Sequence, residues 1–270
     1  MINIKRKQKR ECSEKEVCHK VKHLKKSFVL DEFLDNGNNR ITYPNHAIIL
    51  GPTQSGKTTL LAKMFDSINE VYRFSTPLNG EKKMIVISPI EYLEIADKMK
   101  TSNEWSMALY SSSYFDSKLI SEIKDKFKES NASVKILLID DFFMKAAKNP
   151  KQIGILNEIY SFFRHMNVSV FSTMHSYNPI FKDLVQQAAV IICMFTPSIF
   201  SILRSILRPH YFLGTADLVR RLKNCYIDKM KIHDYLIVYN TKESFGGQNF
   251  YISNNIFNPR FGITNRQFLE

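Results

Sequence analysis

AIILGPTQSGKTTLLAKMFDSIN, residues 47–69, carries the strongest structural signal in the chain. Its first four residues, Ala47–Leu50, are apolar and predict a buried strand. The loop that follows satisfies the pattern G-x-x-x-x-G-K-[ST] in full, from Gly51 to Thr58. Apolar residues then recur at the spacing of one helical face: Leu60, Leu61, Met64, Phe65 and Ile68. A strand, a glycine loop and a helix are the context that a phosphate-binding loop requires.

The glycine loop predicts a site for ATP and its Mg²⁺ ion. Gly51 and Gly56 would let backbone N–H groups converge on the β-phosphate, and the following helix adds its positive end. Lys57 would reach the β- and γ-oxygens, while the Thr58 hydroxyl would coordinate Mg²⁺. The expected nucleotide-binding set is Gly51, Pro52, Thr53, Gln54, Ser55, Gly56, Lys57, Thr58 and Thr59. A purely structural turn is the alternative, but it does not explain the flanking strand and helix.

Two acids follow the most apolar strand expected in the chain, residues 134–139. Ligands collect at the carboxyl ends of strands in open α/β sheets, so we expect Asp140 to hold Mg²⁺ together with Thr58. Asp141, one peptide further, would point toward the γ-phosphate and orient a water molecule. The alternative role for such a pair is a helix N-cap. The complete phosphate loop favours the catalytic role.

Apolar segments of strand length alternate with amphipathic helices through the rest of the chain. Further strands are expected at 84–88, 107–110, 168–173, 189–195 and 235–239, and further helices at 119–128, 152–164, 199–207 and 216–223. This alternation predicts the α/β fold of a P-loop NTPase of the RecA/FtsK kind, with a largely parallel sheet covered by helices on both faces. We expect a basic arm at 1–40, the ATPase domain at 41–245 and a tail at 246–270.

Composition narrows the class of protein. No run of about 18 apolar residues occurs, and the N-terminus has no apolar signal region, so neither a membrane span nor secretion is expected. The net charge is +12, and residues 1–26 hold ten Lys or Arg against three Glu. Such an arm suggests a nucleic-acid partner; a solubilising tail or nuclear-import signal is the alternative.

The basic arm also contains four possible zinc ligands: Cys12, Cys18, His19 and His23. Their spacing fits none of the common zinc-finger patterns, and the segment is densely charged. A solvated basic arm is therefore favoured over a metal site.

The class of P-loop protein follows from other motifs. The N-K-x-D and D-x-x-G motifs of GTPases do not appear, and residues 197–208 make a poor arginine-rich lid for a nucleotide kinase. A motor needs a polar sensor on the strand beside the acidic strand, where Thr173 and His175 are expected. It also needs an arginine offered to a neighbouring subunit, and Arg164 precedes that strand.

The segments that carry this pattern are GPTQSGKT (51–58), ILLIDDF (136–142), FFRHMNVSVFSTMHSY (162–177), AAVIICMF (188–195) and SILRSIL (201–207). Together they resemble the poxvirus-type DNA-packaging ATPases of the FtsK–HerA superfamily, over roughly residues 47–207. The resemblance implies a homo-oligomeric ring of five or six subunits that hydrolyses ATP while drawing double-stranded DNA into a capsid. It also implies capsid vertex or portal proteins as partners, and a place in the virion or at a host-cell assembly site, in cytoplasm or nucleus.

The resemblance also implies residue roles. Lys57 and Thr58 match the phosphate and magnesium residues, Asp140 the second-strand acid, and Asp141 the place where many members have a catalytic glutamate. His175 falls where the family typically shows a glutamine sensor, which leaves its sensing role open. Arg164 matches a trans-acting arginine finger, with a helix-end arginine favoured by the helix dipole as the alternative.

Some assignments stay open at the level of sequence. Arg204 and Arg208 would serve DNA, a neighbouring subunit or only a solvated helix face. A cellular or mobile-element translocase or helicase-like ATPase would use the same parts as a packaging motor. So would an ATP-binding switch that hydrolyses too slowly to pump.

Overall fold

The computed structural model describes residues 41–74, 80–88, 105–112, 114–141, 149–207, 230–231, 233–239, 251–253 and 262–264, together with 216, 219–220 and 223–224. The basic arm with Cys12, Cys18, His19 and His23 lies outside these residues, as do Arg208 and most of the expected tail. Within the described part, no helix has both the length and the apolar character needed to cross a bilayer.

The elements follow the expected alternation of strands and helices. The strands are β1 (Ile41–Thr42), β2 (Ala47–Leu50), β3 (Tyr72–Arg73), β4 (Lys82–Ser88), β5 (Trp105–Ser111), β6 (Val134–Ile139), β7 (Ser169–Met174), β8 (Val190–Met194), β9 (Tyr235–Tyr239), β10 (Tyr251–Ser253) and β11 (Gly262–Thr264). The helices are α3 (Lys57–Asp66), α4 (Ile68–Val71), α6 (Ser117–Lys128), α8 (Pro150–His165), α9 (Lys182–Gln187) and α10 (Ile199–Leu207), with a 3₁₀ turn η1 (Pro179–Phe181).

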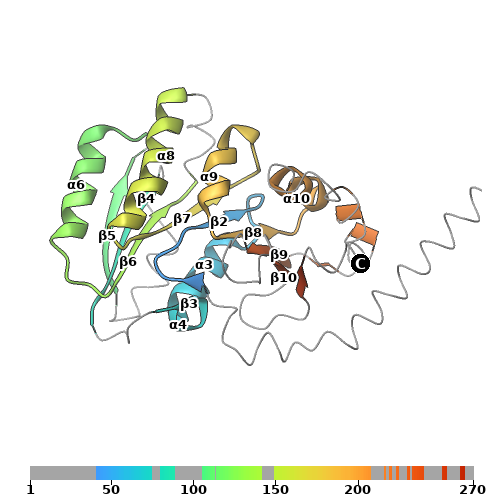
Figure 1. Ribbon diagram of the computed structural model, residues 1–270, viewed down its shortest axis with the longest axis horizontal. Coiled ribbons are helices and arrows are strands. Elements are labelled where there is room, and N and C mark those ends of the chain that lie inside the picture. Colours follow the sequence, from blue (N-terminus) through green and yellow to red (C-terminus); the bar gives the residue numbers. More distant parts are fainter. Residues whose placement is uncertain are drawn as a thin grey trace, which may run out of the picture.

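The described strands form one large sheet in the order β11-β10-β9-β8-β2-β7-β6-β4-β5, beside a small β1–β3 pair (Figure 1). The strands from β8 to β5 are all parallel, and β9, β10 and β11 add an antiparallel end. Strand β7 lies between β2 and β6. Because parallel strands end at the same edge, the segments after β2, β7 and β6 become neighbours.

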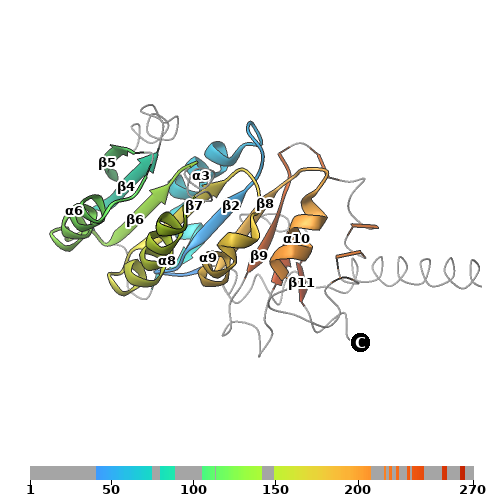
Figure 2. The same ribbon diagram turned by 90° about the horizontal axis from the view of Figure 1, so that it is seen from above.

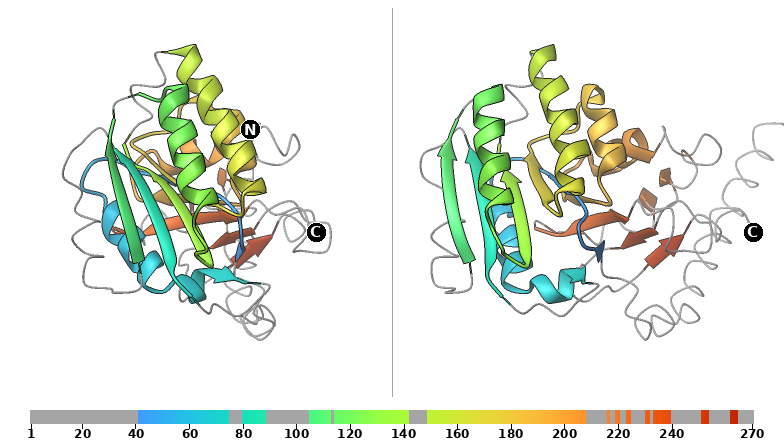
Figure 3. Two further views of the ribbon diagram at one scale, coloured as in Figure 1. Left: turned by 90° about the vertical axis from the view of Figure 1, so that its left-hand side faces the viewer. Right: turned by 60° about the vertical axis from the view of Figure 1, so that its left-hand side comes forward.

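Helices cover both faces of this sheet. Helices α6, α8, α9 and α10 lie on one face, and α3 with α4 lies on the other (Figures 2 and 3). Alternate side chains of β2 serve the two cores: Ile48 and Leu50 pack under the four-helix face, whereas Ala47 and Ile49 pack under α3 and α4. A strand buried on both faces must be apolar throughout, and β2 is.

Local signals place the ends of the longer helices. The Asp116 side chain accepts a hydrogen bond from Leu119 N and begins α6, and the Asn149 side chain accepts from Lys151 N and begins α8. The helix expected after the glycine loop is divided at Ser67 into α3 and α4. Helix α9 was not expected, because its six residues are too few for a clear period.

Two short strands lie within the tail expected at 246–270. Tyr251–Ser253 pairs with β9, and Gly262–Thr264 pairs with Tyr251–Ser253, both antiparallel. Three-residue strands carry too little periodicity to be recognised in a sequence, since backbone pairing with an existing sheet edge defines them. The domain boundaries themselves stay predictions.

A buried histidine joins three elements under the four-helix face. His46 Nε2 lies 2.7 Å from the Tyr160 carbonyl oxygen, and Val170 N donates to His46 Nδ1 at 2.9 Å. A carbonyl oxygen only accepts, so Nε2 carries the proton and the ring is neutral. The pKa of His46 is lowered to about 4, mainly because the ring is buried. The Tyr160 carbonyl raises the pKa, and the nearby positive charge of Arg164 contributes to lowering it.

This histidine should make the fold acid-sensitive. The pKa of His46 is lower in the folded than in the unfolded chain, so below about pH 6.5 the unfolded chain binds the proton first. The free energy of unfolding should therefore fall as the pH drops from about 6.5 to 4, with His46 contributing roughly 3 kcal/mol. Urea unfolding at several pH values, for wild type and His46→Gln, measures this. Equal pH slopes in the two proteins would contradict it.

Candidate active site

The glycine loop is held tightly between β2 and α3. Gly51 N donates to the Met174 carbonyl oxygen at 2.9 Å, which fastens the loop to the end of β7. A Cβ atom on Gly51 would lie 2.6 Å from Met194 Cβ and 2.7 Å from Ser55 Oγ, so no side chain fits there. Gly56 adopts φ +93° at the start of α3, a conformation that favours glycine. Both glycines of the motif are thus required by the backbone.

Lys57 opens α3 and is largely buried. Its Nζ donates to the carbonyl oxygens of Gly51 at 2.8 Å and Pro52 at 2.9 Å, which curls the side chain along the loop. Burial lowers the pKa of Lys57, and the negative charges of Asp141 and Asp140 oppose that shift. The two acids are thus close enough to the ammonium group for their charges to act on it, at the edge of the sheet where β2 and β6 end.

A threonine on β7 organises both acids. Thr173 Oγ1 donates to Asp140 Oδ1 at 2.6 Å and accepts from Asp141 N at 2.9 Å. Burial raises the pKa of Asp140; the Thr173 hydroxyl opposes this and the neighbouring Asp141 charge adds to it. A partly buried carboxylate with a raised pKa beside a second acid is a group that a cation would stabilise.

His175 links the acids to the glycine loop. Its Nε2 lies 3.3 Å from Asp141 Oδ1, although that oxygen lacks a partner with hydrogen-bond geometry among the described residues, and its Nδ1 lies 3.5 Å from Thr53 Oγ1. Asp141 adopts φ +49°, an unusual conformation for a residue with a side chain. Such backbone strain concentrates at functional sites, because neighbouring contacts must maintain it.

The donor set fits the expected cofactor. Thr58 lies in the first turn of α3, and the charge of Asp140 acts on Lys57, the first residue of that helix. A hydroxyl and a carboxylate are the hard oxygen ligands that Mg²⁺ prefers. The buried Ser55 Oγ has no hydrogen-bond partner within the described part of the chain.

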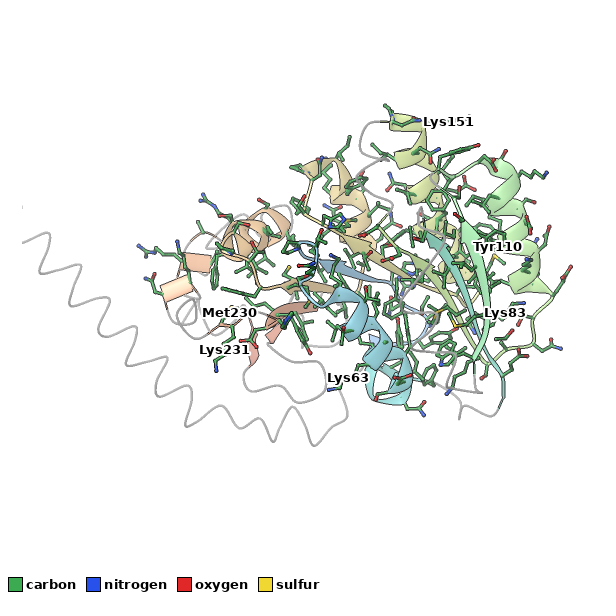
Figure 4. All side chains as sticks on the ribbon, turned by 180° about the vertical axis from the view of Figure 1, so that it is seen from behind. Lys63, Lys83, Tyr110, Lys151, Met230 and Lys231 are labelled. Atoms are coloured by element: carbon green, nitrogen blue, oxygen red, sulfur yellow. The ribbon has the colours of Figure 1, made fainter. Side chains whose placement is uncertain are left out.

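Arg164 is the predicted residue that does not reach this site in its own chain. Helix α8 runs antiparallel to β7 and ends beside the start of that strand, where Tyr43 OH donates to the Asn167 carbonyl oxygen at 2.6 Å. Figure 4 shows Lys151, at the start of α8, at the other end of the sheet from Lys83, at the start of β4. Helix α8 therefore begins near the edge where the parallel strands end, and Arg164, in its last turn, lies near the edge where they begin. Strand β7 spans about 20 Å, so Arg164 and the glycine loop lie at opposite edges of the sheet.

A second hollow, away from the glycine loop, lies beside α10 and is lined by basic residues. A pocket of about 580 Å³ lies between α10 and the described residues of 216–223. Arg204, Arg220 and Lys223 supply its charges, and Phe200 and Val219 supply apolar surface. The lining of this pocket contains no acidic side chain among the described residues.

Sequence reasoning missed one residue at the loop. His233 precedes β9, and its Nδ1 lies 3.1 Å from the Ser55 carbonyl oxygen. The contact joins positions 178 residues apart, and nothing in the local pattern around residue 233 indicates it.

Comparison with protein-family models and with curated proteins gives no match. Among solved structures, the chain is similar to the genome packaging NTPase B204 from Sulfolobus turreted icosahedral virus 2 in complex with AMP. The identity is 15% and the TM-score 0.50, over 78% of this chain and 96% of that one. B204 from Sulfolobus turreted icosahedral virus, a DNA-packaging ATPase, matches at 14% identity and TM-score 0.49, over 77% and 96% of the two chains.

A third similar structure is the cytoplasmic domain of the Thermomonospora curvata type VII secretion ATPase EccC. It matches at 13% identity and TM-score 0.44, over 73% of this chain and 24% of that one. At such identities the likeness to the AMP complex of B204 shows a common fold. Together with the sheet order, it confirms the predicted α/β architecture of a P-loop NTPase.

Proposed function

We propose that this protein is an ATPase of the FtsK–HerA type that drives double-stranded DNA into a viral capsid. The observation that carries the ATPase part is geometric: Lys57 lies along the glycine loop, and His175 lies between that loop and Asp141. The packaging part is supported by the sequence resemblance and by the fold shared with B204, a genome packaging NTPase. ATP and Mg²⁺ are the cofactors of this proposal.

Each residue then has a chemical role. The loop backbone binds the β-phosphate, and Lys57 leaves the Gly51 and Pro52 carbonyls to contact the β- and γ-oxygens. Thr58 and Asp140 would hold Mg²⁺, which would supply positive charge to offset that of the phosphate oxygens. Asp141 orients the attacking water, and His175 lies between Asp141 and Thr53 on the loop. Thr173 keeps both acids in place through its hydroxyl group.

The assembly belongs to the same proposal. A ring of five or six subunits would place Arg164 of one subunit against the nucleotide of the next, because Arg164 lies at the sheet edge opposite its own loop. Capsid vertex or portal proteins would be the docking partners. The site of action would be the virion or a host-cell assembly site, in cytoplasm or nucleus.

Phosphate release with and without linear duplex DNA tests the motor function, and displacement of a third strand from a triplex on that DNA tests movement. We expect DNA to stimulate turnover and ATP to drive displacement. Turnover that ignores DNA would favour the ATP-binding switch instead. Cellular and mobile-element translocases would also displace the third strand without a capsid. Protection of the DNA from nuclease when capsids are present therefore distinguishes a packaging ATPase from such translocases.

Arg204 supplies a test of the DNA surface. We propose that the pocket between α10 and residues 216–223 contacts the DNA backbone, since its lining is basic. Arg204→Ala should lower the slope of log affinity against log salt by about 1, and equally on unrelated sequences. Fluorescence anisotropy between roughly 50 and 200 mM salt measures this slope. Lys118→Ala, an exposed lysine on α6, is the matched control. An unchanged slope for Arg204→Ala would refute this contact.

A further inference from the structure

The turn that carries His233 is closed by its own hydrogen bonds and tied to the end of β8 at Asp234. Lys231 N donates to Asp234 Oδ2 at 2.8 Å, and Asp234 N donates to the Lys231 carbonyl oxygen at 3.0 Å. Phe195 N donates to the Asp234 carbonyl oxygen at 2.7 Å, which ties the turn to the end of β8. His233 itself adopts φ +76°. A residue with a side chain rarely occupies this conformation, so the surrounding contacts hold it there.

The imidazole of His233 contacts the glycine loop. His233 Nδ1 lies 3.1 Å from the Ser55 carbonyl oxygen, and a Cβ atom on Gly56 would lie only 3.2 Å from the same nitrogen. A carbonyl oxygen can only accept a hydrogen bond, so Nδ1 carries the proton and donates it. The histidine thus contacts the one peptide that joins the last loop residue to the glycine before Lys57.

Because the Ser55–Gly56 peptide is planar, the contact with His233 fixes the orientation of the whole peptide group. In a trans peptide the C=O and N–H groups point in opposite directions, so fixing the Ser55 oxygen also fixes the direction of Gly56 N–H. We propose that His233 is a positioning residue: it holds the Ser55–Gly56 peptide with its N–H toward the bound β-phosphate. This inference rests on the proposed function, because it presumes a nucleotide at the loop.

The position at φ +76° permits a sharp pair of variants. His233→Gly removes the donor while suiting the left-handed conformation. His233→Asn keeps a side-chain N–H donor, and asparagine also tolerates that conformation. Lys231→Ala, an exposed side chain in the same turn, is the matched control (Figure 4).

The experiment measures the Kd of Mg·ADP and of inorganic pyrophosphate by calorimetry, with thermal unfolding as a check on the fold. His233→Gly should weaken both ligands by about five- to tenfold, the effect of one hydrogen bond. Asn at 233 and Ala at 231 should stay within about twofold of wild type. A purely structural role would lower the unfolding temperature and leave both Kd values unchanged.

Two results would overturn the inference, and they are distinguishable. If His233→Gly binds both ligands like wild type while Lys57→Ala loses them, the site stands and the role of His233 is refuted. If the wild-type protein itself binds neither ligand, the proposed function fails, and the role of His233 fails with it.

Discussion

Replacing Lys57 with alanine should lower ATP turnover by about 10²–10³-fold, the usual loss when one charged donor to a transition state is removed. Lys57 lies along the loop, where its Nζ donates to the Gly51 and Pro52 carbonyls, and the charges of the two acids act on it. Its side chain is therefore within reach of a phosphate seated in that loop. Steady-state phosphate release at saturating ATP measures the effect.

Lys151→Ala is the control for this loss, because Lys151 is an exposed lysine at the start of α8. That variant should retain wild-type turnover. Circular dichroism melting of Lys57→Ala would show whether the fold survives. Undiminished turnover in a folded Lys57→Ala protein would contradict the assignment of this loop as the hydrolysis site.

Replacing Arg164 with alanine should lower turnover by about 10³-fold or more, the effect of an arginine finger that contacts the transferred phosphate. The structure constrains how this could happen. Arg164 lies at the edge of the sheet opposite its own glycine loop, near His46, whose pKa its charge lowers. A direct contact of Arg164 with the transferred phosphate would therefore have to be made at the loop of a neighbouring subunit.

Mixing experiments separate this role from a structural one. Arg164→Ala subunits mixed with Lys57→Ala subunits should regain part of the turnover that each variant lacks alone, because a Lys57→Ala subunit still offers Arg164 to a neighbour whose loop is intact. His165→Ala, an exposed neighbour on the same helix end, should keep wild-type turnover without mixing. A mixture that stays inactive would refute the trans role. If Arg164 only complements the helix dipole, its removal should cost about 0.3–1 kcal/mol of stability and leave turnover unchanged.

The parts of the site that follow from local sequence were predictable. Residues 47–66 form a strand, a loop and a helix in direct succession, so their geometry depends on adjacent residues and on two glycines. Strand β6 was predicted with its observed bounds, because a run that is apolar except for Lys135 suits a strand largely buried on both faces. Placing Asp140 and Asp141 at its end then required only the rule that ligands collect at the carboxyl edge.

Contacts between distant segments were out of reach of that reasoning. Thr53 and His175 are 122 residues apart, and His233 and Ser55 are 178 apart. Hydrophobic periodicity reports which face of an element is buried, but not which loops meet at a sheet edge. Strands β10 and β11 were not predicted for a related reason. Strand β10 is defined by its pairing with β9, and β11 by its pairing with β10, more than by their own residues.

The chain's own order of residues was thus enough to specify a phosphate loop, an acidic strand end and alternating strands and helices, because each depends on neighbours a few positions away. Only folding settled that β7 separates β2 from β6, that Thr173 bonds to both acids, and that Arg164 lies at the sheet edge opposite its own loop. The physical reason is that strand order and loop meetings arise from packing a complete sheet between two helical layers, which no single segment encodes.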